Sequence, residues 1–335
     1  MKIKGTKILV TGGAGFIGSH IVDSLVRQGA QVTIYDNFSS GLMENLQDVR
    51  KDVKIIRGDI LDRARLSRAI KGAEVVSHQA AQLEITRCID DPVEDLQMNT
   101  VGTLNVLHAC VTHGVGKLIS ASSACVYGQA ERIPESEDKH PTNPNWAYGV
   151  SKLAGEKYCA IYSELYKMPT VCLRYGIVYG PREWYGRVLT IFLRRALSGK
   201  PPVVFGKGDQ LRDFTFVGDV VRLHDLCILR DTGPHQVLNA STGKATSIEQ
   251  LARQVVSVTG IKTHPLHESV APGERSELVE ENRMRLPSEL QAMVLSPARG
   301  RALLGWKPEV ALKAGLKIEW EWISANPGRW KSMSY

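Results

Sequence analysis

The sequence has few of the features that mark metal-binding, secreted or membrane-spanning proteins. Its six cysteines form no CxxC pair, and even the nearest two, Cys159 and Cys172, are 13 positions apart. This spacing predicts neither a zinc site nor a disulfide framework, so we expect a cytoplasmic protein without a bound metal. No apolar run approaches the ~18 residues of a membrane span, and the short run after the N-terminal MKIKGTK does not fit a signal peptide.

The charge balance says little about partners. A formal net charge of +7 in 335 residues is a mild basic excess without a basic block. Such an excess favours anionic small molecules at least as readily as nucleic acid, and a solvated basic surface explains it best. We therefore expect no nucleic-acid partner. The length suggests about two domains.

In the first half of the chain, short β-branched runs alternate with amphipathic stretches. The runs expected to be strands are 7–10, 31–36, 53–59, 73–78, 116–123 and 169–175, and the expected helices are 17–28, 63–71, 99–113 and 148–166. Nearly continuous apolar strands that alternate with helices predict an α/β fold with a doubly wound parallel sheet of the Rossmann type.

After Tyr175 the regular alternation stops, and proline and glycine become frequent. We expect a Rossmann domain over residues 1–175, and a smaller, irregular substrate domain over residues 176–335. Segment 213–241 is expected to return to the first domain, with one more strand at 235–241. A last helix is expected at 310–325, ahead of Pro327.

A glycine motif follows the first expected strand. Gly12, Gly15 and Gly18 in VTGGAGFIGSH stand between that strand and a helix, whose free N–H groups and dipole favour a pyrophosphate. Asp36 ends the second strand, where a carboxylate accepts hydrogen bonds from ribose hydroxyls and repels a 2′-phosphate. The next residues, 37–39, include no arginine, so the sequence predicts NAD and not NADP.

Other residues fall at the carboxyl edge of the expected sheet, where open α/β sheets bind ligands. They are Asp59 and Ile60 after the third strand, Ala80 and Ala81 after the fourth, and Ser122 and Ser123 at the end of the fifth. Their position favours a ligand site over a purely structural glycine turn.

The stretch YGVSK places Tyr148 and Lys152 four residues apart, on one face of an expected helix. A phenol with a pKa near 10 is a poor base at neutral pH. A nearby ammonium and the positive nicotinamide of bound NAD would lower that pKa and make Tyr148 a usable general base. An exposed helix pair is the alternative, and the two serines at the end of the preceding strand argue against it.

Motifs that run in order over nearly the whole chain resemble those of one enzyme family. They are TGGAGFIGSH, YDNFSSG, GDI, HQAAQ, NTVGTLNVLHA, SSACVYG, YGVSK, LRYGIVYGPR, GDQLRDFTFVGDVV and ARGRALLGWKP. The chain resembles the extended short-chain dehydrogenase/reductases of the nucleotide-sugar epimerase and dehydratase group, of the UDP-glucose 4-epimerase type.

The resemblance implies a catalytic trio. Ser123 would hydrogen-bond the sugar oxygen that is oxidised, Tyr148 would take its proton, and Lys152 would hold the ribose of NAD and tune the tyrosine. The other residues implied around NAD are Phe16, Ile17, Asn37, Ser39, Ser40, Gly41, Gln79, Gln82, Asn99, Ser122, Tyr175, Ile177 and Val178.

Two positions directly after the catalytic hydroxyl residue differ between reactions in this family. Dehydratases carry Asp-Glu there and decarboxylases typically carry Glu at the second position, because both chemistries need another proton-transfer group. This chain has Ala124 and Cys125, and Cys125 is interpreted as a small apolar side chain because no histidine lies nearby in sequence. The resemblance therefore implies a C4 epimerase that forms a transient 4-keto sugar. A dehydratase or other oxidoreductase, and a non-catalytic NAD-binding module, are the alternatives.

On the substrate side, the resemblance implies that Arg212 clamps the nucleotide diphosphate, although a surface pair with its neighbour is possible. It also implies that Val203 and Phe205 contact the base, with UDP the commonest nucleotide. Gly176 and Ile177 replace a usual Phe-Asn, which suggests room for a bulkier sugar.

Further arginines are candidates for contact with the diphosphate or with a uronate carboxylate: Arg182, Arg187, Arg283 and Arg285. The last two lie in segment 275–294, which is longer than in relatives and is equally consistent with a solvated helix. Family members commonly form homodimers through two helices that correspond here to 99–113 and 148–166. These helices contain the apolar residues Leu104, Leu107, Ile161 and Leu165, which form such an interface or face the sheet.

Overall fold

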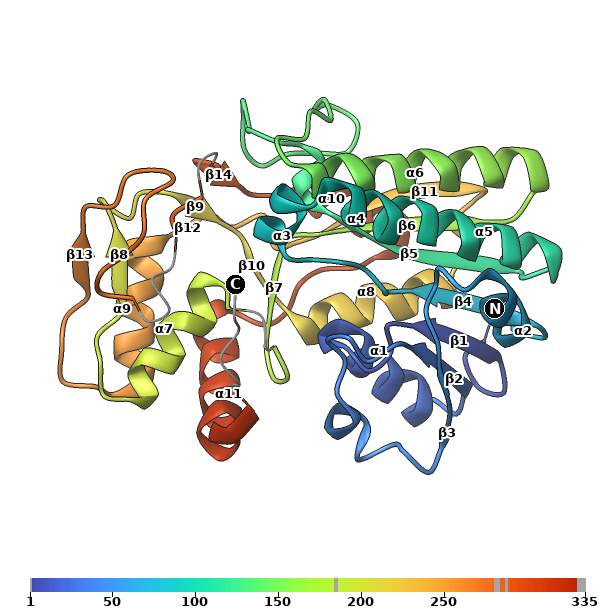
Figure 1. The fold of residues 1–335 in the computed structure, drawn as a ribbon, viewed down its shortest axis with the longest axis horizontal. Helices are drawn as coiled ribbons and strands as arrows, with labels where there is room; N and C mark the ends of the chain where they lie inside the picture. The colour runs from blue at the N-terminus through green and yellow to red at the C-terminus, as the bar shows by residue number, and fades with distance from the viewer. Residues whose placement is uncertain (1, 184–185, 280–283, 287–288, 330–335) are drawn as a thin grey trace.

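The structure is built around one seven-stranded sheet. The computed structural model describes residues 2–183, 186–279, 284–286 and 289–329. The strands run parallel in the order β11-β6-β5-β4-β1-β2-β3 (Figure 1). Their bounds are β1 (Lys7–Thr11), β2 (Gln31–Asp36), β3 (Val53–Arg57), β4 (Val75–His78), β5 (Lys117–Ser123), β6 (Thr170–Tyr175) and β11 (His235–Ala240). This confirms the Rossmann-type sheet, and the seventh strand forms at the expected place.

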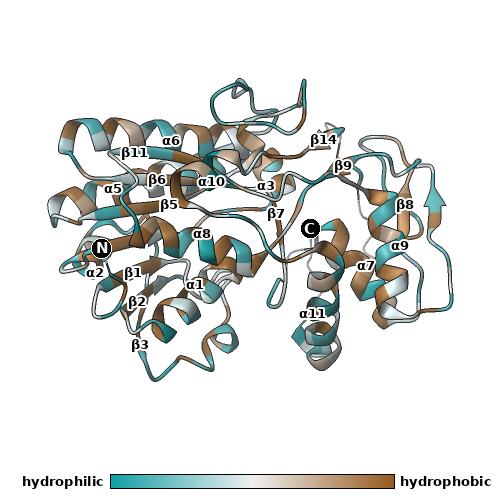
Figure 2. Ribbon diagram, turned by 180° about the vertical axis from the view of Figure 1, so that it is seen from behind, coloured by the Kyte–Doolittle hydropathy of each residue, from teal (hydrophilic) through white to brown (hydrophobic). Residues whose placement is uncertain are grey.

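Helices cover both faces of this sheet, which explains why every residue of β4 and β6 is buried and why their sequences are so apolar. One face packs against α1 (Phe16–Arg27), α8 (Val217–Leu229) and α10 (Ala298–Leu304), and the other against α2 (Arg63–Ile70), α5 (Gly102–Thr112) and α6 (Ala147–Tyr166). In Figure 2 the central strands are largely coloured as hydrophobic between these two layers.

The helix expected at 99–113 is longer than the sequence pattern indicated. After α3 (Ile85–Asp90), the chain continues through α4 (Pro92–Asp95), the π-helical segment η2 (Leu96–Val101) and α5. The start is set by Asp91, whose side chain accepts a hydrogen bond from the backbone N–H of Glu94 (2.9 Å), and by Pro92 in the first turn. The expected start at Asn99 was therefore wrong, because the Asp-Pro signal lies a full seven residues earlier.

A smaller group of elements lies beside the sheet, at the left of Figure 1. Helices α7 (Val188–Leu197), α9 (Ile248–Thr259) and α11 (Leu312–Ala325) share one apolar core. The short strands pair as β7 (Ile177–Tyr179) with β10 (Phe214–Phe216), β8 (Val203–Phe205) with β13 (Leu266–Glu268), and β9 (Leu211–Arg212) with β12 (Thr246–Ser247) and β14 (Ala292–Met293). Single 3-10 turns are η1 (Met43–Leu46), η3 (Ala124–Val126) and η5 (Pro327–Arg329).

Two further findings concern the sequence expectations. Segment 275–294 contains no helix in its described residues; it contributes β14 and a bridge between Arg275 and Met284. The solvated-helix interpretation is therefore wrong for that part. Within the described ranges, no helix is long and apolar enough to cross a membrane. All six cysteines are buried and free.

Candidate active site

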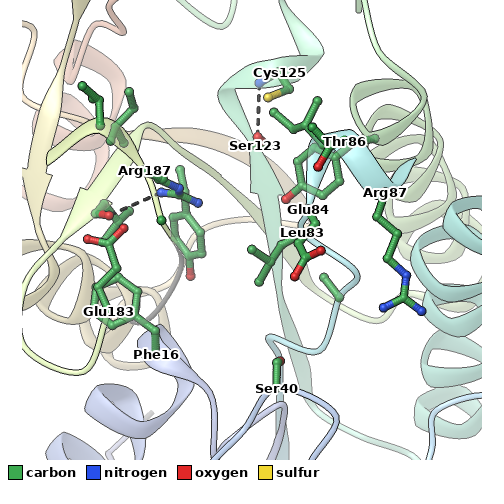
Figure 3. Close-up of a pocket in the computed structure, with 18 of the residues that line it drawn as sticks. Phe16, Ser40, Leu83, Glu84, Thr86, Arg87, Ser123, Cys125, Glu183 and Arg187 are labelled. Carbon is green, nitrogen blue, oxygen red and sulfur yellow. Dashed lines mark hydrogen bonds between the residues drawn. The ribbon is translucent and has the colours of Figure 1, made fainter. Parts of the chain in front are cut away.

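A cavity of about 890 Å³ lies at the carboxyl edge of the sheet, between the strand ends and the smaller group of elements (Figure 3). The sequence-predicted residues that line it are Gly12, Gly15, Phe16, Ile17, Gly18, Asp36, Asn37, Ser39, Ser40, Gly41, Ile60, Gln79, Ala80, Ala81, Ser122, Ser123, Tyr148, Lys152, Tyr175, Ile177, Val178, Arg187, Val203, Phe205 and Arg212. Asp59, Gln82 and Asn99 do not line it, and Arg283 lies outside the described residues.

The glycine turn has no room for side chains. Gly12 has a positive φ of 66°, and a Cβ on it would lie 2.6 Å from the backbone nitrogen of Ala80. A Cβ on Gly18 would lie 2.1 Å from the carbonyl oxygen of Gly12, so the turn packs directly on α1. No side chain caps the first turn of α1, where Gly15 is the N-cap. Its N–H groups are therefore placed to receive a dinucleotide pyrophosphate.

Asp36 is fixed by the backbone on both sides. Its Oδ2 accepts a hydrogen bond from the N–H of Ala14 (2.9 Å) and its Oδ1 accepts one from the N–H of Phe38 (2.8 Å). Burial raises the pKa of Asp36, and these two hydrogen bonds act in the opposite direction. The second lone pair of each oxygen suits the ribose hydroxyls of NAD. The glycine turn and Asp36 together therefore fit this cofactor.

Asn99 and Gln82, both expected at the cofactor, bind each other instead. The side-chain oxygen of Asn99 accepts a hydrogen bond from the N–H of Gln82 (3.0 Å), and its amide donates to the carbonyl of Gln82 (2.8 Å) and to Asp95 (2.6 Å). Asp95 also accepts a hydrogen bond from Ser151, the neighbour of Lys152 (2.5 Å). These residues tie the loop after β4 to the helix α6.

Asp59 is likewise used within the fold, since it accepts hydrogen bonds from the N–H of Leu61 (2.8 Å) and from the side chain of Asn37 (2.9 Å). It therefore positions Asn37, which does line the cavity. The contact with Asn37 was not apparent from the sequence, because Asn37 follows another strand.

Ser123, Tyr148 and Lys152 meet in the cavity, from the end of β5 and the first turns of α6. The ammonium nitrogen of Lys152 donates to the carbonyl of Ala121 (3.1 Å) and lies 5.7 Å from the ring centroid of Tyr148. The hydroxyl of Ser123 accepts a hydrogen bond from the N–H of Cys125 (3.2 Å; Figure 3).

In the protein without NAD, burial dominates the electrostatics of this trio. Burial raises the pKa of Tyr148, and a hydrogen bond with Ser123 opposes the rise. Burial lowers the pKa of Lys152 to about 8, although the nearby carboxylate of Asp95 acts to raise it. The expected lowering of the Tyr148 pKa therefore does not occur in the protein alone, because desolvation dominates. The cationic nicotinamide ring of NAD, bound beside the phenol, would have to lower the pKa of Tyr148.

Only one of the two serines in SSACVYG is available to a ligand. The hydroxyl of Ser122 donates to Oε1 of Glu156 (2.5 Å), which also holds Arg174. Ser123 remains at the cavity, and burial raises the pKa of Cys125. The cysteine is therefore a thiol and not a nucleophile, as the sequence suggested.

The substrate end of the cavity is basic. Arg212 faces it, with its Nη2 3.6 Å from Oε1 of Glu289, and Asp213 is buried against Thr242 and Gly243. The surface pair between Arg212 and Asp213 is therefore absent. Arg187 is the N-cap of α7 and donates to the carbonyl of Val178 (3.4 Å).

Of two further arginines, one points away from the cavity and the other lines it. Arg182 is turned away from the cavity and pairs with Asp23 (2.8 Å), so its expected contact with diphosphate or uronate was wrong. Arg285 does line the cavity, and its Nε donates to Glu289 (2.9 Å).

Gly176 does not provide the expected extra room. A Cβ there would lie 2.7 Å from Oγ of Ser241, so the side-chain direction points into packed protein. The apolar wall near Tyr148 comes instead from Cys125 and from five residues that the sequence did not single out: Ile85, Trp146, Leu286, Leu290 and Met293.

Charged residues at the cavity were also missed, chiefly Glu84 and Glu183. Glu84 comes three residues after Ala81, at the same carboxyl edge, and this position was the available signal. Nothing in the stretch GPRE distinguishes Glu183 from an exposed loop residue.

A Rossmann sheet with a glycine turn, an acidic residue on the second strand and a Ser-Tyr-Lys trio defines an NAD-dependent short-chain dehydrogenase/reductase. The family model described as "NAD dependent epimerase/dehydratase family" matches residues 8–241. The chain therefore belongs to this family, as an extended short-chain dehydrogenase/reductase with NAD as its cofactor.

Individual relatives cover nearly the whole chain. A putative UDP-glucose 4-epimerase of Methanocaldococcus jannaschii is 35% identical, over 95% of this chain and 99% of its own. The dTDP-D-glucose 4,6-dehydratase of Mus musculus is 31% identical, over 97% and 91%. The structure of Thermus thermophilus UDP-glucose 4-epimerase in complex with NAD superimposes with a TM-score of 0.83, at 34% identity over 95% and 98%. The chain is thus similar to nucleotide-sugar epimerases and, less closely, to a dehydratase.

Proposed function

We propose that the protein is an NAD-dependent enzyme that inverts C4 of a UDP-sugar through a transient 4-keto intermediate. The observation that carries this proposal is the trio of Ser123, Tyr148 and Lys152 at the cavity, with Ala124 and Cys125 where dehydratases and decarboxylases have acids. The similarity to a putative UDP-glucose 4-epimerase over nearly the full length supports the same reaction.

The glycine turn and Asp36 would hold NAD, which would supply reversible hydride transfer at C4 of the sugar. Ser123 orients the C4 oxygen by a hydrogen bond, and Tyr148 removes its proton and later returns it. Lys152 holds positive charge 5.7 Å from the phenol ring and favours its ionised form. The high pKa of the buried Cys125 thiol keeps that residue out of proton transfer.

The nucleotide would bind across the smaller group of elements. Arg212 and Arg187 would bind its diphosphate, since arginine matches phosphate oxygens in two-point hydrogen bonds. Val203 and Phe205 on β8 would contact the base. The names of the relatives favour UDP as the nucleotide. We also propose that residues 176–335 form the substrate domain, and that segment 213–241 within it returns to the NAD-binding domain.

We further propose a homodimer formed through α5 and α6. On α6, Ile161 is 46% exposed and Leu165 is 66% exposed, although both are large and apolar. Leu107 is fully buried in the core at the sheet, which is one of the two places expected for it, and Leu104 is half-buried.

Proton NMR tests the reaction. The protein is incubated with NAD and, separately, with UDP-glucose, UDP-N-acetylglucosamine and UDP-glucuronate, with Tyr148→Phe as the matched control. We expect a second anomeric signal that grows to a constant ratio in one of the three samples. Loss of water or of carboxylate would instead identify a dehydratase or decarboxylase. Unchanged substrates in all three samples, and in dTDP-glucose and GDP-mannose, would favour the binding-module alternative.

A further inference from the structure

Glu183 is a buried carboxyl group that faces the cavity without a partner. It follows Arg182 after β7, is 3% exposed and lines the cavity. Figure 3 shows it between Phe16 and Arg187. Neither of its oxygens has a hydrogen-bond partner in the part of the chain that the structure describes. A buried polar group left in this way is costly unless a ligand completes it.

A second buried carboxyl group lies behind it. Glu319 on α11 is fully buried, and its two oxygens also have no hydrogen-bond partner among the described residues. Burial raises the pKa of both glutamates, and the carboxylate of Glu183 raises that of Glu319 further. Arg187 acts in the opposite direction on Glu183, and the phenol of Tyr179 is the remaining titratable neighbour of Glu319.

We propose that Glu183 binds a phosphate oxygen of a bound nucleotide. This inference rests on the proposed function, because the nucleotide is the ligand that the function supplies. Two sources of phosphate meet at this place: the pyrophosphate of NAD, at the start of α1 beside Phe16, and the diphosphate of the nucleotide sugar, beside Arg187.

The chemistry explains why the protonated form matters. An ionised carboxylate next to a phosphate repels it, whereas a carboxylic acid donates one short hydrogen bond to it. Arg187 adds positive charge at the same place. Affinity for the phosphate should therefore fall as pH rises and Glu183 loses its proton.

Calorimetric titrations between about pH 6 and about pH 9 test this, with NAD and with UDP-glucose in separate arms. Neither pyrophosphate ionises in this range, so a pH effect comes from the protein. In the wild-type protein we expect the affinity for one of the two ligands to fall at least about tenfold with rising pH. That ligand identifies the source of the phosphate.

Three variants separate the causes. Glu183→Gln keeps a neutral donor and should remove the part of the pH dependence that comes from Glu183. Any part that remains in the NAD arm comes from Lys152, whose pKa burial lowers to about 8. Glu319→Gln keeps this neighbour neutral, so the pH course should stay as in the wild type. Glu321→Gln, an exposed glutamate on the same helix, should behave as the wild type. An identical pH course in all four proteins overturns this inference and leaves the proposed function intact. If the wild type binds neither ligand at any pH, both proposals fall.

Discussion

Arg174 forms two hydrogen bonds with the carboxylate of Glu156, at 2.8 and 2.7 Å, and both residues are buried. The pair joins β6 to α6, two turns after the tyrosine of the catalytic trio. Ser122 adds a third hydrogen bond to the same carboxylate, and the Arg174 guanidinium lies 4.6 Å from the ring centroid of Tyr127. This cluster fixes the helix that presents Tyr148 and Lys152.

Removing one partner of this ion pair should destabilise the protein strongly. Arg174→Met leaves the Glu156 carboxylate buried and unpaired, and we expect a loss of about 3–5 kcal/mol in the free energy of unfolding. Arg174→Met combined with Glu156→Leu should lose much less, because no charge stays buried. Urea denaturation measures both. Equal losses in the single and double variants would contradict the argument.

Tyr148→Phe should leave the fold and NAD binding intact and should slow turnover by about 10²–10⁴-fold, because only the proton-transfer group is lost. Tyr166→Phe is the matched control, since Tyr166 is 53% exposed on the same helix. Steady-state rates and NAD titrations measure the two properties. Full activity in Tyr148→Phe would remove the tyrosine from the mechanism.

Asp36→Asn should weaken NAD binding by about 10–100-fold, because hydrogen bonds from the ribose hydroxyls to a charged acceptor are lost. The discrimination against NADP should shrink at the same time, since the carboxylate no longer repels a 2′-phosphate. Fluorescence titration with both dinucleotides measures this, and Asp52→Asn, on the surface, is the control. An unchanged ratio of the two affinities would speak against the ribose contact.

The free energy of unfolding should fall as pH rises above about 4.5, because Glu135 has a higher pKa in the folded than in the unfolded protein. Burial raises the pKa of Glu135 to about 8. The folded state then holds a proton that the unfolded state has released, so rising pH favours unfolding by at most about 1.4 kcal/mol per pH unit up to that pKa. Glu135→Gln should remove this slope, and Glu131→Gln, exposed nearby, should keep it. Denaturation midpoints over this pH range decide the point.

Leu165→Arg should convert a dimer to a monomer if α5 and α6 form the interface. A charge in the centre of an apolar interface has no partner there, so association weakens strongly. Light scattering measures the mass. Leu303→Arg on α10, at the opposite face of the sheet, should leave the mass unchanged. A monomeric wild type would overturn the homodimer.

The features that sequence reasoning predicted depend on neighbours in the chain. The strands were predicted from local apolar runs. Gly12, Gly18 and Asp36 were predicted from a motif that covers one continuous strand-helix-strand segment of the chain. The features that it missed depend on contacts between distant segments. Glu183 and Glu319 are 136 positions apart, and no local pattern brings them together.

The orientation of single side chains was equally inaccessible. Arg182 has a positive φ of 70° and pairs with Asp23. Its side chain therefore points away from the cavity, although the next residue lines it. Asn99 was assigned to the cofactor, whereas it exchanges hydrogen bonds with Gln82, a contact that no local sequence pattern indicates.

The π-helical segment Leu96–Val101 makes the packing of this helix sensitive to the exact number of residues in it. Its wide turn accommodates one residue more than an α-helix would between Pro92 and Thr112. Inserting one further residue there would exceed what this turn accommodates and rotate everything before the insertion by about 100°. Asp95 would then turn away from Ser151, the residue beside Lys152. A one-residue insertion in the outer layer would thus displace the neighbour of Lys152.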